Sequence, residues 1–119
     1  MYSKLEKFIL DDSRRKWMHI GTFKVYMRKS IRMRNNKFMK CIDIANIENC
    51  DETQRGKGKF WELISKIQSF IFQSNVEFDA IFIESVINPQ LVMSLKNRDW
   101  NFDDISNFWL ELPTPTKIF

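Results

Sequence analysis

The sequence predicts a single domain of the mixed α/β class. Two long stretches alternate between apolar and polar residues and are separated by Asn35-Asn36, which indicates a hairpin. A short apolar run at residues 80–83 is typical of a central strand that is covered on both faces. Helix-like stretches precede and follow that run, so the predicted order is helix, strand, strand, helix, strand, helix, strand.

The first half of the chain is predicted to form a helix followed by the hairpin. Residues 3–18 are mixed, but Leu5, Phe8, Ile9 and Asp12 lie at helical spacing, and Trp17 closes either the short helix or its exit turn. From His19 the apolar residues recur at every second position, which predicts a half-buried strand. Asn35-Asn36 tolerates positive φ and predicts a turn, and residues 38–48 form the return strand.

The second half is predicted to alternate helices with strands. Residues 60–73 carry an apolar stripe at helical spacing and give the clearest helix of the chain. Beyond the central strand, Asn88-Pro89 combines an N-cap with proline at the first helical position, so a helix runs from there to about Arg98. Residues 108–112 predict a last strand.

Length and composition fit one domain with a real core. The chain has 119 residues, of which 44% are apolar, so it is long enough to bury a core. We expect the domain to span residues 1–112 and to be followed by a tail over residues 113–119. The net charge of +4 favours anionic ligands or partners.

The cysteines and apolar runs indicate a cytoplasmic protein. Cys41 and Cys50 are the only cysteines, and two thiols without a secretion signal are typical of a reduced compartment. With one histidine they do not make a zinc site, so no metal is expected. No run approaches the ~20 apolar residues of a membrane span, and no membrane partner is expected.

Arg55-Gly56-Lys57-Gly58 lies between a predicted strand and a predicted helix. Glycines leave backbone N–H groups free to close on an anion, and the helix that follows adds its unpaired N–H groups and a positive dipole end. This order predicts a phosphate site, with pyrophosphate as its ligand. It is neither a Walker loop nor the dinucleotide fingerprint, because the third glycine would fall at Trp61.

These stretches resemble the GNAT superfamily of N-acetyltransferases. Residues 42–48 look like the family's fourth strand, and Arg55 to Phe60 is similar to its motif [RQ]-x-x-G-x-[GA]. Ala80 to Val86, with the helix from Asn88 to Trp100, looks like the fifth strand and fourth helix. The resemblance implies a mixed sheet with a V-shaped splay between two central strands, helices on both faces, and acetyl-CoA or another acyl-CoA in the splay.

The resemblance also implies which residues hold the cofactor. The glycine motif would cradle the pyrophosphate, backbone groups at the end of the fourth strand would pair with the pantetheine arm, and an asparagine would contact that arm. Carried over to this sequence, the cofactor-binding residues are Ile47, Glu48, Asn49, Cys50, Arg55, Gly56, Lys57, Gly58, Lys59, Phe60 and Asn88. The sequence departs from the family at Leu95, where many members place the tyrosine that protonates the leaving thiolate.

Direct transfer of an acyl group to an amine needs a base and a polarised carbonyl. Glu48, at the end of the fourth strand, is the leading candidate base, and Asp43 lies deeper in the same strand. Glu84 is a third candidate on the opposite wall of the splay. A backbone N–H near Glu48 to Cys50 would polarise the carbonyl. The acceptor could be a small amine, a protein N-terminus or lysine, or a nucleobase.

The hairpin carries a second signal, a set of basic residues at Arg28, Lys29, Arg32 and Arg34. A protruding basic hairpin can follow phosphates, which makes nucleic acid a candidate partner. The alternative reading is a solvated hairpin that charge protects from edge pairing. The second function class is therefore a non-catalytic GNAT-like module that binds nucleic acid or a protein. The aromatic C-terminal strand could also pair with a second copy to form a homodimer.

Overall fold

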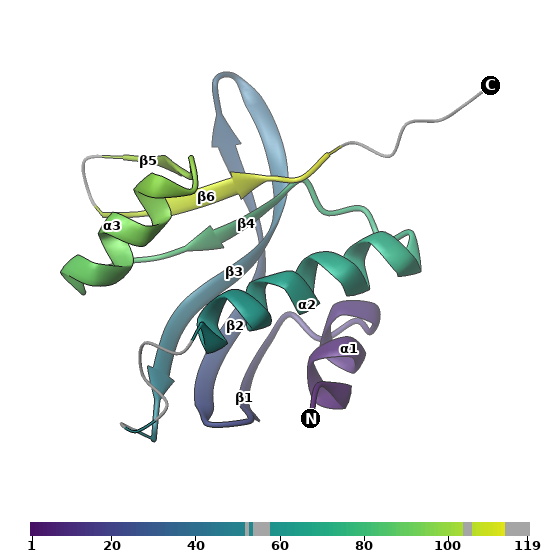
Figure 1. Ribbon diagram of the computed structural model, residues 1–119. Helices are drawn as coiled ribbons and strands as arrows, with labels where there is room; N and C mark the ends of the chain where they lie inside the picture. Colours follow the sequence, from purple (N-terminus) through teal and green to yellow (C-terminus); the bar gives the residue numbers. More distant parts are fainter. Residues whose placement is uncertain (52, 54–57, 104–105, 114–119) are drawn as a thin grey trace.

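A six-stranded mixed sheet with strand order β1-β2-β3-β4-β6-β5 forms the centre of the computed structural model (Figure 1). Residues 1–51, 53, 58–103 and 106–113 are described. The strands are β1 (Arg15–Ile20), β2 (Phe23–Arg34), β3 (Lys37–Asn49), β4 (Ala80–Ile83), β5 (Asn101–Phe102) and β6 (Phe108–Glu111), and the helices are α1 (Ser3–Leu10), α2 (Lys59–Ser74) and α3 (Pro89–Asn97). Among the described strands, only β3 and β4 pair in parallel. The predicted mixed α/β class is confirmed.

The predicted hairpin of β2 and β3 is confirmed, with Asn35 and Asn36 at φ 50° and 61° in its turn. The exit turn expected near Trp17 is wrong, because that residue lies within β1. Met18 and Ile20 of this strand are buried, and Gly21 at φ 58° turns the chain into β2. A two-residue turn between alternating strands produces a hairpin, so the chain opens with three consecutive antiparallel strands.

The two helices predicted after the hairpin are confirmed. Leu63, Ile64, Ile67 and Ile71 form the buried stripe of α2. Asn88 caps α3, since its side-chain oxygen accepts hydrogen bonds from the next two free N–H groups of the helix. The two-residue strand β5 falls in a stretch where no strand is predicted.

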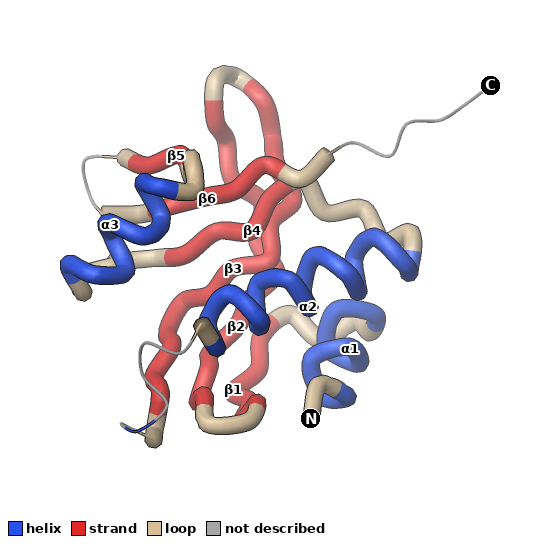
Figure 2. Tube along the Cα trace, in the orientation of Figure 1, coloured by secondary structure: helices blue, strands red, loops and turns tan. Residues whose placement is uncertain are grey.

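All three helices cover the same face of the sheet. Their buried residues belong to one apolar core with the inward residues of the strands, and Figure 2 shows α2 crossing in front of the sheet. The opposite face carries a small cluster of Met39, Cys41, Ala80 and Phe82, against which Trp109 packs, and no described helix contributes to it. The expectation of helices on both faces is therefore wrong for the described residues. The opposite face is rich in charged side chains, which a helix could not bury without desolvating them.

Candidate active site

The strands β3 and β4 separate to form an opening. They pair from Cys41/Ala80 to Ile44/Ile83, and the N–H of Glu84 still donates to the carbonyl of Ile44 at 3.1 Å. Beyond that point β3 continues to Asn49, whereas β4 has ended. The predicted V-shaped splay between two central strands is thus confirmed, and its apex lies at Ile44.

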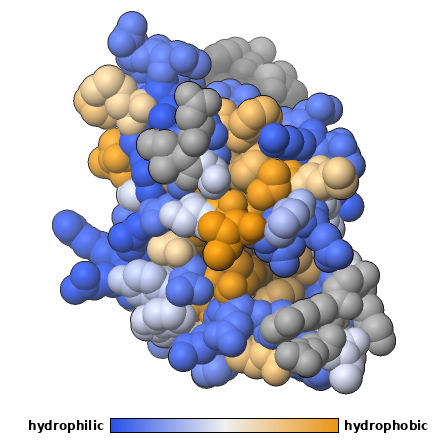
Figure 3. Space-filling model, turned by 90° about the vertical axis from the view of Figure 1, so that its left-hand side faces the viewer, coloured by the Kyte–Doolittle hydropathy of each residue, from blue (hydrophilic) through white to orange (hydrophobic). Residues whose placement is uncertain are grey.

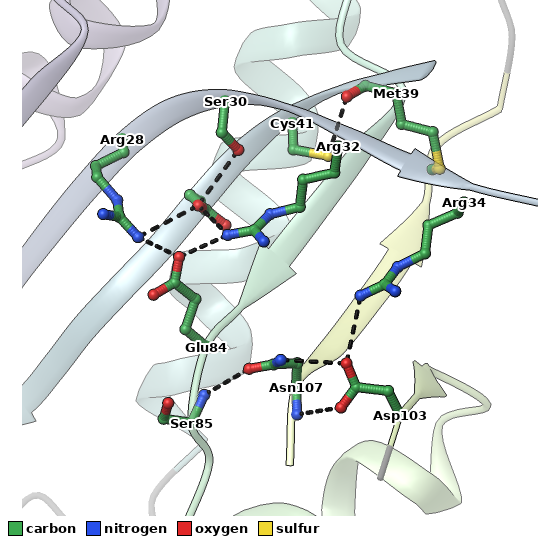
Figure 4. A network of polar contacts seen from close by, with 11 residues as sticks. Arg28, Ser30, Arg32, Arg34, Met39, Cys41, Glu84, Ser85, Asp103 and Asn107 are labelled. Carbon is green, nitrogen blue, oxygen red and sulfur yellow. Dashed lines mark hydrogen bonds and ion pairs between the residues drawn. The ribbon is translucent and has the colours of Figure 1, made fainter. Parts of the chain in front are cut away.

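Backbone irregularities on both walls produce the splay. Ser85 adopts φ 51°, a left-handed conformation that ends a strand, and its N–H donates to Asn107 Oδ1 at 3.0 Å (Figure 4). The N–H of Val86, which would be the next to face β3 in a regular ladder, donates instead to the carbonyl of Ser106 at 2.8 Å. On the other wall the register of β2 and β3 shifts between Tyr26 and Met27, which leaves Ala45 as an extra residue in β3. Such a bulge bends its strand and increases its twist.

The bulge also decides which backbone groups face the opening. Cys50 donates its N–H to the carbonyl of Thr22, and antiparallel partners alternate between hydrogen-bonded and non-hydrogen-bonded pairs. The N–H groups of Glu48 and Cys50 therefore point to β2, and those of Ile47 and Asn49 point to the opening. Of the four predicted backbone contacts on this strand, the geometry favours Ile47 and Asn49.

The helix α2 is the next element in the chain after β3, which forms one wall of the opening. Gly58 adopts φ 73° at the N-cap, and no side chain caps the helix there. A Cβ at Gly58 would have no neighbour within 4 Å, so glycine is needed for the left-handed backbone rather than for space. Lys59 is exposed and pairs with Glu62 at 3.5 Å, while Phe60 packs at the edge of the core. Arg55, Gly56 and Lys57 lie outside the described residues.

A strip of hydrophobic surface, hollowed in its middle, runs between polar regions on the side of the molecule seen in Figure 3. Ile47 of β3, Phe60 of α2 and Leu91 of α3 are partly buried apolar residues that pack against the core from three different elements. Ile87, which follows the splay, exposes 86% of its surface. Apolar surface bordered by polar groups is a common property of ligand-binding sites.

Two of the three predicted carboxylates meet at the apex, on the face without helices. One guanidinium nitrogen of Arg32 lies 2.7 Å from Asp43 Oδ2 and 2.6 Å from Glu84 Oε1. Arg28 pairs with Glu84 and lies 3.7 Å from Asp43 Oδ2, and Ser30 donates its hydroxyl to the same oxygen at 3.3 Å. Figure 4 shows Arg28 and Arg32 converging on Glu84. Both carboxylates are thus held at the point where the strands separate.

The environment separates the pKa values of this pair. Burial raises the pKa of Asp43 to about 6, and a hydrogen bond with Glu84 adds to the shift against the opposing effect of Arg32. Burial also raises the pKa of Glu84, but hydrogen bonds with Asp43 and Arg28 outweigh it and leave the value lowered. Asp43 therefore holds a proton more readily and Glu84 carries the negative charge. A pair tuned apart in this way is a frequent sign of acid–base chemistry.

The remaining predicted residues lie away from the apex. Glu48 is exposed opposite Lys24, five residues along β3 from Asp43, a separation of about 15 Å. Asn88 uses its side-chain oxygen to cap α3, and Leu95 is fully buried in the core. The described residues hold no cluster of metal ligands, and none of their helices is both long and apolar enough to span a membrane.

The four basic residues proposed to bind nucleic acid are all ion-paired within the chain. Arg28 and Arg32 contact the apex carboxylates, Lys29 lies 3.7 Å from Asp11, and Arg34 lies 3.3 Å from Asp103. Sequence reasoning missed these pairings, because a charged hairpin edge normally faces water. Nucleic-acid binding through these residues stays a prediction.

Comparison with known proteins identifies the fold. No protein-family model and no curated protein matches the sequence. Among solved structures, a mutant AtaT toxin bound to the C-terminus of the antitoxin AtaR and acetyl-CoA has a TM-score of 0.59 at 13% identity, over 76% of this chain and 58% of that chain. AtaT complexed with acetyl-methionyl-tRNAfMet gives 0.59 at 8% identity, over 76% and 62%. The KacTA–DNA complex gives 0.60 at 12% identity, over 91% and 79%.

AtaT and KacT are GNAT-fold acetyltransferases, so the resemblance noted in the sequence is confirmed at the level of the fold. This chain therefore has the GNAT fold. It spans only 58% of the AtaT chain in the complex with AtaR and acetyl-CoA.

Proposed function

We propose that this chain transfers an acetyl or related acyl group from acyl-CoA directly to an amine. The observation that carries the proposal is the opening between β3 and β4, which has paired carboxylates at its apex and an uncapped helix start after its β3 wall. The acetyl-CoA in the complex of the similar AtaT toxin supports this choice of donor.

The residues of the opening fit an acyl-CoA. The uncapped N-terminus of α2, with Gly58 and Lys59, suits a diphosphate, because helix starts offer N–H groups and a positive dipole end. The N–H groups of Ile47 and Asn49 face the opening and suit the amides of the pantetheine arm. The hydrophobic strip suits its apolar segments. A bound acyl-CoA supplies an acyl group already activated as a thioester.

Glu84 is the proposed proton acceptor. Its side chain is 23% exposed, against 1% for Asp43, so an acceptor amine can approach Glu84 directly or through one water. Arg28 and Arg32 fix the position of its carboxylate, and Arg32 also links it to Asp43. Glu48 remains the alternative base, about 15 Å further along the same strand.

The proton for the departing thiolate does not come from the family's usual position, because Leu95 is buried and has no proton to give. Water or the hydroxyl of Ser85, which is exposed next to Glu84, would supply it.

Calorimetric titration with acetyl-CoA tests the cofactor site. Lys59→Glu should weaken binding about tenfold or more, because it opposes the diphosphate. Folding should be preserved, because the lost pair with Glu62 is exposed and therefore weak, and an acidic residue in the first turn favours the helix dipole. Lys66→Glu makes the same charge change about 10 Å along the helix and should leave the affinity unchanged. Absence of acetyl-CoA binding, or equal losses in both variants, would refute the assignment.

Release of free thiol in the presence of an amine tests the chemistry. Glu84→Gln should retain acetyl-CoA binding and slow transfer by roughly 10²- to 10⁴-fold, the usual range for a lost general base. Glu48→Gln, an equivalent change on the exposed part of β3, should have little effect. If Glu48→Gln produces the loss and Glu84→Gln does not, the base is Glu48 and the apex pair has a structural role.

A further inference from the structure

Two arginines face each other across β1 and β2 on the open face of the sheet. Arg15 is the direct partner of Arg28, and such partners place their Cβ atoms about 5 Å apart on one face. Arg28 is already paired with Glu84. Arg14 and Arg15 are exposed, and no carboxylate of the described residues lies within 4.0 Å of either. Like charges directly opposite destabilise a strand pair, so this arrangement needs an explanation other than stability.

The same residues line a concavity of about 600 Å³ that opens on this face. Arg14 and Arg15 lie on its wall with Arg28 and Arg32, and Asp43 also lines it. The size falls within the range of small-molecule sites. The concavity therefore joins two arginines, unpaired among the described residues, to Asp43, the buried member of the carboxylate pair at the apex of the splay.

A second observation points to a ligand here. The side chain of Asp43 is 1% exposed, and its Oδ1 has no hydrogen-bond partner among the described residues. The Nε of Arg32, on the same wall, also lacks a partner there. Buried polar atoms are nearly always paired, so unpaired ones on residues of this wall call for a partner that the described residues do not supply, such as a bound group or a water.

We propose that this concavity is the acceptor site and that the acceptor is an amine that also carries a phosphate or carboxylate group. Arg14 and Arg15 bind the anionic group, and Glu84, which is held next to the concavity by its wall residues Arg28 and Arg32, takes the proton of the amine. That the acceptor carries an amine rests on the proposed acyl transfer. That it carries an anionic group rests on the charges of the concavity alone. Arg14 and Arg15 line a single concavity rather than an extended basic track, which favours a compact acceptor over a long polyanion.

Binding of inorganic phosphate tests the anion end without turnover. In ¹H–¹⁵N spectra, phosphate should shift the amide resonances of residues 14–17, and Arg14→Gln/Arg15→Gln should abolish these shifts. Lys4→Gln/Lys7→Gln removes the same charge from exposed positions on α1 and should keep them. The double arginine variant should fold at least as well as the natural chain, because it removes a like-charge pair. Shifts confined to the start of α2, or shifts that survive in the arginine variant, would overturn the proposal.

Matched acceptors test the amine end. O-phosphoethanolamine is compared with ethanolamine, and 4-aminobutyrate with butylamine, in acetyl transfer from acetyl-CoA. For at least one pair, we expect kcat/KM to be about tenfold or more higher for the anionic member. This estimate allows a factor of about ten in kcat/KM for each charge-assisted hydrogen bond that the anionic group gains. The pair that responds identifies phosphate or carboxylate as the recognised group. The arginine variant should bring the ratio close to one and keep its affinity for acetyl-CoA.

The two proposals fail in different ways. Transfer at equal rates to both members of both pairs, or an unchanged preference in the arginine variant, would overturn the anionic acceptor and leave acyl transfer intact. Phosphate shifts at residues 14–17 without transfer to any amine would overturn acyl transfer, and with it the acceptor role of the concavity.

Discussion

The buried carboxylate at the apex makes stability depend on pH in a direction that can be worked out. Burial raises the pKa of Asp43 from 3.8 to about 6 in the folded chain. Folding therefore takes up a proton between these values, so the contribution of Asp43 is fully present below the unfolded pKa and is lost as pH rises through 6. The whole shift corresponds to about 3 kcal/mol, of which roughly half falls between pH 5 and 7.5. The lowered pKa of Glu84 acts at more acidic pH, outside this window.

Asp43→Asn isolates this effect, because the amide resembles the protonated acid in shape and stays neutral. The free energy of unfolding, measured by urea titration with tryptophan fluorescence, should fall from pH 5 to 7.5 in the natural chain and stay nearly flat in the variant. At pH 7.5 the variant should be at least as stable. Glu48→Gln removes an exposed charge from the same strand and should keep the natural slope. A natural chain that is flat over this range, or an Asn variant with the same slope, would refute the argument.

Three further substitutions probe the walls and helices of the site. Asn107→Ala leaves the N–H of Ser85 without its partner and should cost about 1 kcal/mol in urea unfolding and weaken acetyl-CoA binding in calorimetry. Asn88→Ala removes the cap of α3 and should also cost about 1 kcal/mol of unfolding free energy. Leu95→Tyr should lower the free energy of unfolding by about 1–3 kcal/mol, because the larger side chain overfills the core. It should not accelerate thiol release, because this position does not lie in the opening.

Local signals were sufficient for most of the fold. The Asn35-Asn36 turn and the capped start of α3 depend on residues next to one another in the sequence, and both were predicted. β1 was missed because six residues gave a short alternation beside a helical pattern. The signal was present: Met18 and Ile20 alternate with polar or exposed residues, and Gly21 marks the turn into β2.

The candidate site was only partly predictable, because it depends on register. The resemblance named Asp43 and Glu84 but not their contact, which requires the parallel pairing of β3 with β4. The burial of Asp43 could not be predicted from alternation. Residues 41–44 are buried on both faces of the sheet, so a polar residue in this stretch does not mark a face exposed to water. Arg32 lies 52 residues from its partner Glu84, and no local pattern relates the two.

The open face explains why the basic residues are where they are. With no helix of the described residues on that side, Phe82 and Trp109 would meet water. However, the guanidinium of Arg32 lies 3.7 Å from the ring centre of Phe82, and the guanidinium of Arg34 lies 4.4 Å from the ring centre of Trp109. Planar guanidinium groups cover aromatic rings while their edges stay hydrated. Here the arginine side chains form a covering layer over the sheet that is thinner than a layer of helices. A thin layer leaves Glu84 at the apex within reach of a ligand, whereas a helix would bury it completely. The arrangement that keeps the second face of the sheet polar is therefore also the one that keeps Glu84 partly exposed, as its proposed role requires.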